Sequence, residues 1–339
     1  MKKQVKALVL LSGGLDSILA VKLLLEQGIA VETINFRTNF CGPSKARPAA
    51  QILGVPLREV NIREDFLLIL KNPKHGYGAG LNPCIDCHAL MLKKAGEIMR
   101  EENSCPERSR RIDFIATGEV LGERPMSQHK QALDIVAKDA DLKGYLLRPL
   151  SAKLLEPTIA EQKGLVDRAK LLDISGRSRK RQMALAKKYG VKEYPTPAGG
   201  CALTQKGFSD RLRELMKHKP DFNSFDVDLV RFGRHFFYPE LVEGGDSLQV
   251  ILGRNQEENE ILASLARPGN ILIEPDNWPG PTALMRFCHP EFNSGSRSRN
   301  EFGMTKDEIV DQVKELILQF SPKAKNFSSS DPKFKLIKK

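Results

Sequence analysis

The chain has 339 residues, 41% of them hydrophobic, which is enough to bury one large core or two ordinary ones and excludes a chain that is disordered throughout. No apolar run approaches the roughly 20 residues of a membrane-spanning helix, and the short apolar run after the N-terminal lysines lacks a signal-peptide cleavage site, so we expect a soluble cytoplasmic protein with no membrane partner. The formal net charge of +11 favours contact with polyanions such as nucleic acid, the alternative being a merely solvated basic surface.

Predicted strands and helices alternate over the first part of the chain. A continuous apolar strand at Val5–Leu11 leads through a glycine turn into a helix at Asp16–Glu26. The pattern then predicts strands at Ala30–Phe36, Leu57–Ile62, Ile112–Ala116 and Leu146–Pro149, and helices at Ser44–Leu53, Ile85–Glu101, Thr158–Leu172 and Ser178–Tyr189. This alternation indicates an α/β fold, a parallel sheet with helices on both faces that binds ligands beyond the carboxyl ends of its strands.

The alternation is lost from about Gln205. We therefore expect a first domain over residues 1–205, a smaller α+β domain over 206–320 and a lysine-rich flexible tail over 321–339. Segments 103–111, 237–245 and 290–300 are polar or turn-rich and are expected to be inserted surface loops. No chemistry is therefore assigned to Cys105 or Cys288, which lie in or beside these segments.

The first motif is Ser12-Gly13-Gly14-Leu15-Asp16-Ser17, between the first strand and the first helix. Adjacent glycines let backbone N–H groups turn toward an anion, the hydroxyls of Ser12 and Ser17 add donors, and the helix N-terminus adds positive charge. Asp16 is placed to hold Mg²⁺ or to cap the helix. The motif indicates a phosphate-binding loop; the alternative is an ordinary glycine turn.

This motif resembles that of the PP-loop ATP pyrophosphatases, which cleave ATP between its α- and β-phosphates. The resemblance implies ATP and Mg²⁺ as cofactors. The resemblance does not identify the substrate that ATP activates, because the superfamily includes amidating ligases and a nitrile synthase as well as tRNA thiolases.

The second motif, Asn82-Pro83-Cys84-Ile85-Asp86-Cys87-His88, opens a predicted helix, and Cys201 follows two glycines much later. Six cysteines without a secretory signal favour metal binding or thiol chemistry in a reducing compartment over a disulfide framework. The positive helix end is expected to lower the pKa of Cys84 and Cys87. The alternative is a set of buried structural cysteines.

Together these motifs resemble those of the tRNA thiolases MnmA and ThiI and of the archaeal-type thiolases. The MnmA pattern implies Cys84 and Cys201 as a catalytic pair that transfers sulfur through a persulfide. The archaeal-type pattern implies Cys84, Cys87 and Cys201 as the ligands of a [4Fe-4S] cluster with one open iron. Both schemes remain open, and the cluster scheme has the advantage that it gives Cys87 a role.

Two further segments extend the resemblance. Thr117-Gly118 follows a strand at the point where family members contact the nucleotide, but the usual histidine after the glycine is replaced by Glu119. Arg124, just beyond, is expected to meet phosphate or RNA or to cap a loop. Residues 247–287 resemble the small RNA-associated domain of the NFACT proteins; the alternative is an ordinary αβ unit.

These features together predict an ATP-dependent tRNA thiotransferase that adenylates a uridine carbonyl oxygen and replaces it with sulfur. Its partners would be tRNA and a sulfur donor, either free sulfide or a cysteine desulfurase relay. The alternatives are a PP-loop amidating ligase or nitrile synthase acting on a small molecule, and a non-catalytic RNA-binding protein. The target uridine, its ring position, the oligomeric state and the role of Cys41 are not predicted.

Overall fold

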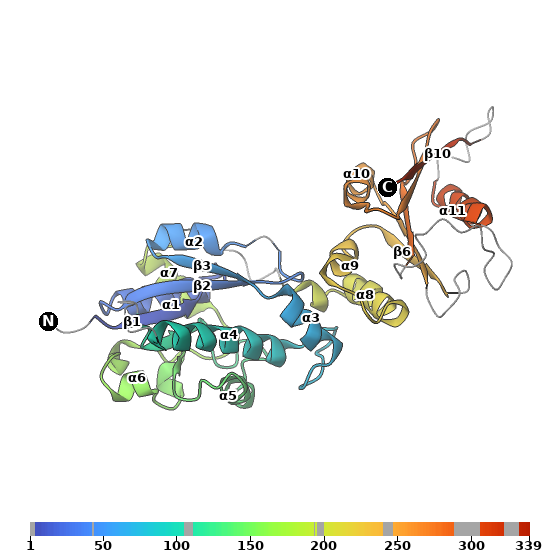
Figure 1. Cartoon of the computed structure of the whole chain (residues 1–339). Coiled ribbons are helices and arrows are strands. Elements are labelled where there is room, and N and C mark those ends of the chain that lie inside the picture. The colour runs from blue at the N-terminus through green and yellow to red at the C-terminus, as the bar shows by residue number, and fades with distance from the viewer. Residues whose placement is uncertain are drawn as a thin grey trace. The chain divides into compact units, whose positions relative to one another are not determined.

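The computed structural model describes residues 4–42, 44–104, 111–192, 194, 200–239, 247–287, 306–321 and 332–339. The chain divides into two compact units, Met1–Gln205 and Lys206–Lys339. Figure 1 shows the elements of both. Within the described residues, no helix combines the length and the apolar character needed to cross a bilayer.

The N-terminal unit is built on a five-stranded parallel sheet with the strand order β3-β2-β1-β4-β5. Its strands are β1 Lys6–Leu10, β2 Ala30–Arg37, β3 Leu57–Asn61, β4 Phe114–Ala116 and β5 Leu146–Leu147. Its helices are α1 Leu15–Leu25, α2 Ala46–Leu53, α3 Arg63–Lys71, α4 Cys84–Ser104, α5 Lys130–Asp139, α6 Ile159–Gln162 and α7 Lys180–Lys188. Single 3₁₀ turns lie at Ala152–Leu154, Arg168–Lys170 and Ala202–Thr204.

Both faces of this sheet are covered. Ala7 and Val9 of β1 are fully buried in a cluster with side chains of α1 and α2, whereas Leu8 is buried on the other face with side chains of α4 and α5. This alternation follows from the two-residue period of a strand, and it explains why β1 reads as a continuous apolar run. The predicted α/β fold with helices on both faces is confirmed.

Several predicted elements differ from the structure. The single helix predicted over Thr158–Leu172 is wrong: α6 ends after Gln162, and Gly164 has a positive φ of 67°, outside the right-handed helical region. The strand predicted to reach Pro149 ends at Leu147, and helices α3 and α5 were not predicted.

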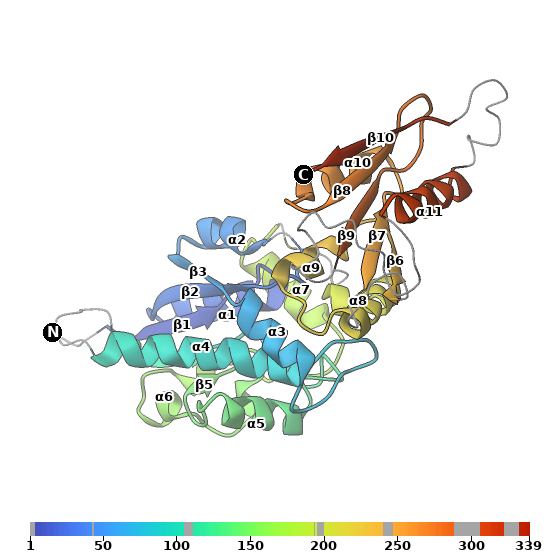
Figure 2. The same cartoon turned by 45° about the vertical axis from the view of Figure 1, so that its right-hand side comes forward.

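The C-terminal unit has a five-stranded antiparallel sheet with the order β10-β8-β9-β7-β6. Its strands are β6 Arg234–Tyr238, β7 Leu248–Leu252, β8 Ile271–Pro275, β9 Ala283–Phe287 and β10 Phe334–Lys338, and its helices are α8 Lys206–His218, α9 Ser224–Leu229, α10 Gln256–Leu265 and α11 Lys306–Gln319. Side chains of α11 pack on one face of the sheet and those of α9 and α10 on the other. Figures 1 and 2 show α10 and α11 on opposite sides of it.

The flexible tail predicted over 321–339 is wrong for its last residues. Strand β10 pairs with β8 along its whole length, and the ring of Phe334 packs edge-on against Trp278 with centroids 5.9 Å apart. Its lysines lie on an edge strand, where charge opposes pairing with another chain. Residues 322–331 lie outside the described residues.

The predicted insertions also differ in part. Residues 103 and 104 belong to α4, and 237 and 238 belong to β6. Segments 105–110, 240–246 and 290–300 lie outside the described residues, as does Cys288.

Candidate functional site: a phosphate-binding loop beside four thiols

The turn between β1 and α1 is held by its own side chains. The hydroxyl of Ser17 donates to the carbonyl of Gly14 over 2.8 Å, and the Gly14 N–H donates to Ser12 Oγ over 3.2 Å. Gly13 has a φ of 79°, and a Cβ there would collide with the backbone of Lys45, so only glycine fits. The loop therefore has a preformed shape, with the N-terminus of α1 behind it.

The segment after β4 packs directly on this loop. A Cβ on Gly118 would lie 2.5 Å from the backbone nitrogen of Ser17, so Thr117 and Gly118 approach the start of α1 more closely than a larger residue allows. The carboxyl ends of β1 and β4 thus form one surface, as expected for neighbouring parallel strands.

Glu119, which stands where the family pattern has histidine, holds a histidine from elsewhere in the chain. Its carboxylate accepts from Thr117 Oγ1 over 3.0 Å and from Arg148 Nε over 2.9 Å, and it contacts His88 Nδ1 at 2.7 Å. Burial alone would raise the pKa of Glu119, but the Arg148 guanidinium and His88 hold it at about 2. Glu119 is therefore ionised, and it fixes the ring of His88, one helical turn after Cys84.

The thiols of the second motif lie at the start of α4. Cys84 is the first residue of the helix, and its sulfur accepts from Asn82 Nδ2 over 3.1 Å. Cys87 lies three residues on, and residues three apart in a helix are neighbours on its surface.

Cys201 comes to the same place from the far end of the unit. The next residue, Ala202, donates its N–H to the carbonyl of Phe40 over 2.9 Å, and Leu203 accepts from the N–H of Leu81 over 3.1 Å. These two bonds hold the Cys201 turn between the segment that carries Cys41 and the one that leads to Cys84.

The environment of Cys87 confirms that four thiols share one neighbourhood. Its pKa is raised well above the usual value, first by burial and then by the charges of Cys201, Cys41 and Cys84. The prediction that the helix end lowers the pKa of Cys87 is therefore wrong, because desolvation and neighbouring thiolates outweigh the helix dipole. None of the four is in a disulfide.

No three Cys, His, Asp or Glu side chains among the described residues are arranged to hold a metal ion. This finding concerns a single ion. A four-iron cluster takes each thiolate on a different iron, so its three protein ligands lie further apart than those of one ion. The donor set of Cys84, Cys87 and Cys201 suits such a cluster chemically.

Sequence reasoning missed several residues at this site. Cys41 had no recognisable motif, and Arg179 and Gln182 belong to a helix that was predicted without a function. Arg179 lies 3.6 Å from the carboxylate of Asp16. The one signal in the sequence was the pair of adjacent charged residues Glu123 and Arg124, which follow the Thr117-Gly118 motif.

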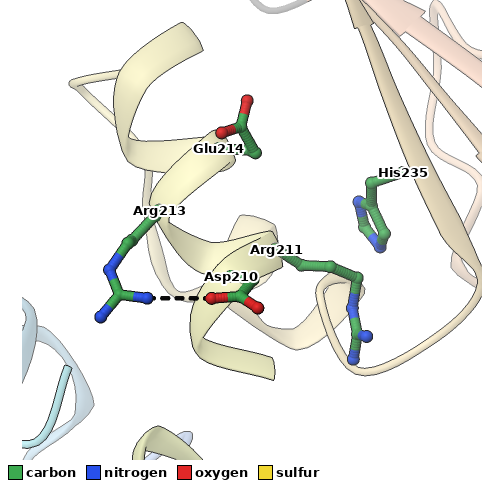
Figure 3. A pocket seen from close by; sticks show the side chains of 5 residues that line it. All are labelled: Asp210, Arg211, Arg213, Glu214 and His235. Carbon is green, nitrogen blue, oxygen red and sulfur yellow. Dashed lines mark hydrogen bonds and ion pairs between the residues drawn. The ribbon is translucent and has the colours of Figure 1, made fainter. Parts of the chain in front are cut away.

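A separate cavity of about 330 Å³ lies in the C-terminal unit, lined by residues of α8 and β6 (Figure 3). Arg211 donates from Nε to the carbonyl of Val230, and Arg213 pairs with Asp210 at 3.0 Å. Burial lowers the pKa of His235 to about 4, so this ring is neutral. Its polar groups are engaged with the protein, and the cavity presents no nucleophile.

The fold and the loop define the N-terminal unit as a nucleotide-binding α/β domain of the PP-loop kind. Residues 5–161 match the family model described as the tRNA methyl transferase HUP domain.

The curated relatives agree with this assignment. The tRNA-specific 2-thiouridylase MnmA of Caldicellulosiruptor saccharolyticus is 31% identical over 47% of this chain and 43% of its own length. MnmA 1 of Syntrophus aciditrophicus is 29% identical over 63% of this chain and 56% of its own length. The chain thus spans about half the length of these relatives.

Among solved structures, a 4-thiouridine synthetase in complex with RNA and ATP shares 20% identity, with a TM-score of 0.38 over 67% of this chain and 52% of that chain. A likeness at this level is too low to support an inference about function.

Proposed function

We propose that the protein is an ATP-dependent tRNA sulfurtransferase that adenylates a uridine carbonyl oxygen and replaces it with sulfur. One observation carries the proposal: the phosphate-binding loop and the four thiols share the carboxyl edge of one sheet. Gly118 packs on the loop, and the next residue, Glu119, holds His88 beside Cys84. A nucleotide site with adjacent thiols suits activation followed by sulfur transfer.

In the first step ATP would be held by Ser12, Gly13, Gly14 and Ser17, with Thr117 and Gly118 against the nucleotide. The uridine oxygen attacks the α-phosphate, an O–P bond forms, and pyrophosphate leaves. Backbone N–H groups at the start of α1 face the charge that develops. Asp16 suits Mg²⁺ because its Oδ1 is buried without a hydrogen-bond partner.

In the second step sulfur displaces AMP. One of Cys84 and Cys201 carries a persulfide, received from the donor, whose terminal sulfur attacks the activated carbon and expels AMP. The thiolate of the other cysteine then attacks the sulfur of the first, which forms a disulfide between them and releases the thiocarbonyl base. A thiol reductant must reduce this disulfide before the next turnover.

The cluster scheme is the second candidate, and the presence of Cys87 in the same group of thiols favours it. Cys84, Cys87 and Cys201 would hold a [4Fe-4S] cluster, which when bound supplies an open iron for hydrosulfide. Anaerobic purification separates the schemes: an iron-free, colourless protein that still thiolates would eliminate the cluster.

The proposed partners are tRNA and a sulfur donor, in the cytoplasm. The net charge of +11 supports a polyanionic substrate. Residues 247–287, which form β7, α10, β8 and β9, are proposed to be the RNA-associated segment of residues 206–320. The donor would be a cysteine desulfurase relay in the persulfide scheme and free sulfide in the cluster scheme.

The test is to incubate the purified protein with unmodified tRNA, ATP and a sulfur donor and to analyse the nucleosides by mass spectrometry. The donor is a cysteine desulfurase with cysteine and a thiol reductant in one arm, which supplies persulfide sulfur, and sulfide in the other, which suits the cluster scheme. The proposal expects a thiouridine, with one AMP and one pyrophosphate formed for each. Ammonia-dependent AMP release with a small molecule and no thionucleoside would instead identify an amidating ligase or nitrile synthase. RNA binding that ATP does not change, without pyrophosphate release, would identify a non-catalytic RNA-binding protein.

A further inference from the structure

A group of charged and polar side chains lies beside the phosphate-binding loop, and apart from Asp16 its members have no role in the steps above. Asp16 comes from the first turn of α1, Glu123 and Arg124 from the segment after β4, and Arg179 and Gln182 from the start of α7. The backbone brings these segments together.

The two outer segments are joined by a parallel bridge between Leu121 and Ser175. The N–H of Gly176 donates to the carbonyl of Leu121 over 2.7 Å, and Gly122 donates to Gln128 over the same distance. Arg179 and Gln182 are thereby held against Asp16 and Glu123, although more than fifty residues separate them in sequence.

Several polar atoms in this group are buried but poorly paired, although Asp16, Glu123 and Arg179 are only partly buried and Arg124 is exposed. Asp16 Oδ1, Arg179 Nε and Gln182 Oε1 are buried and have no hydrogen-bond partner, and Gln182 is completely inaccessible. Two contacts in the group are long, 3.6 Å from Arg179 to Asp16 and 3.4 Å from Gln182 to Glu123, and Gln182 also interacts with Asp16. Ordinary charge-assisted bonds measure about 2.7–2.9 Å, so these groups are positioned without being satisfied by one another.

The pKa values of the two carboxylates, Asp16 and Glu123, are both raised. Burial raises the pKa of Asp16, although Arg179 and Arg124 oppose the rise. Burial and the nearby charge of Asp16 raise the pKa of Glu123. Two neighbouring carboxylates with raised pKa values suit a hard divalent cation, and the guanidinium groups near them suit phosphate oxygens.

We propose that Glu123 joins Asp16 in holding the divalent cation and that Arg124 and Arg179 bind the β- and γ-phosphates of ATP, which become the leaving pyrophosphate. The catalytic use of this group rests on the proposed function, since only there does pyrophosphate leave. The binding of a magnesium–pyrophosphate complex by this group does not depend on the proposed function. The cation and the arginines would neutralise the charge that gathers on the leaving group.

The arginine is tested by calorimetric titration of the full chain with magnesium pyrophosphate. Arg179→Gln should weaken binding roughly 10- to 100-fold, the value of a charge-assisted contact. Arg181→Gln is the matched control, because Arg181 lies on the same helix but is half exposed and pairs with Asp173 at 2.6 Å. Equal affinity in the Arg179 and Arg181 variants would overturn the assignment of Arg179.

The carboxylate is tested with Mn²⁺, whose binding in the presence of pyrophosphate is read by electron paramagnetic resonance. Glu123→Gln should weaken Mn²⁺ binding about tenfold, whereas Glu97→Gln, on the exposed side of α4, should not. Unchanged Mn²⁺ affinity in the Glu123 variant would overturn the second-ligand role.

Thermal unfolding distinguishes lost binding from misfolding. Because Glu123 is destabilised by burial beside Asp16, Glu123→Gln should unfold at a higher temperature than the natural protein without ligand. It should also gain less stability on adding magnesium pyrophosphate. A lower melting temperature without ligand would contradict the proposed repulsion. These binding tests use no tRNA, so a failure of thiolation and a failure of this proposal are distinguishable.

Discussion

Each unit of the protein has a group of charged and polar side chains with buried atoms, and the two groups are built differently. In the C-terminal unit Arg286 contacts Asp226 at 2.7 Å and Gln249 at 2.6 Å, and Gln249 contacts His235 at 2.9 Å. In this network, among the described residues, one atom lacks a partner, Nη2 of Arg286. In the group around Asp16, three atoms lack partners and the contacts exceed 3.3 Å.

This difference separates a structural role from a binding role. A buried polar network whose members satisfy one another stabilises one packing of the core. Buried groups without partners cost free energy in the ligand-free protein, so each calls for an explanation, and a ligand that completes their bonds is the natural one. The comparison therefore supports the proposed ligand site in the N-terminal unit.

The largest effect on stability is expected from breaking the C-terminal network. Arg286→Met leaves Asp226 buried at 2% exposure without its nearest cation and should cost about 3–5 kcal/mol in the free energy of unfolding. Urea unfolding followed by Trp278 fluorescence measures this, because Trp278 is the only tryptophan and lies in this unit. A loss under about 1 kcal/mol would show that Lys219, 3.7 Å from Asp226, compensates for Arg286.

Acid should weaken the two units at different pH values. The pKa of His235 is lowered from 6.5 to about 4, so its contribution is present above pH 6.5 and is lost as the pH falls toward 4. The pKa of Glu119 is lowered from 4.5 to about 2, so its contribution is lost only below pH 4.5. Each of these two side chains contributes at most about 3 kcal/mol of pH-dependent stability to the free energy of unfolding.

Trp278 fluorescence should therefore report a falling urea midpoint for the C-terminal unit as the pH drops from about 6.5 to 4. His235→Phe should be less stable at neutral pH but should lose this pH dependence. An unchanged slope in the variant would assign the acid sensitivity to another group.

A methyl group at the strand-end contact should affect the N-terminal unit alone. Gly118→Ala places a Cβ 2.5 Å from the backbone of Ser17 and should cost about 1–3 kcal/mol and weaken ATP binding. Gly42→Ala is the control, because a Cβ there meets nothing within 4 Å. Equal ATP affinity in both variants, measured by calorimetry, would show that the Gly118 contact does not shape the nucleotide site.

The smallest effect concerns the reactivity of the thiols. Cys41 is exposed, whereas burial and the neighbouring thiolates raise the pKa of Cys87. Because the thiolate is the reacting form, iodoacetamide at neutral pH should modify Cys41 before Cys87 in the apoprotein. Peptide mass spectrometry over a time course reads the order. Faster modification of Cys87 would contradict the raised pKa of its thiol.

Local patterns were enough to predict the sheet, the glycine turn before α1 and the position of Cys84 at a helix start. Each of these depends on residues close in sequence, such as the glycines before α1 or the cysteines at the start of α4. The break at Gly164 was missed because the apolar spacing of a helix continues past it. The pairings of His88 with Glu119 and of Arg179 with Asp16 were missed because they join separate elements. Strand β10 was missed because its pairing with β8 depends on distant residues.

The most direct test of the account is a paired measurement on Cys84→Ser and Cys201→Ser with tRNA, ATP and sulfur donor. Because the proposed nucleotide activation uses the loop and the proposed sulfur transfer uses the thiols, both variants should release pyrophosphate in a tRNA-dependent burst yet form roughly a thousandfold less thiouridine than the natural protein. Thiouridine formation at the natural rate by either variant would contradict the central claim that these thiols deliver the sulfur.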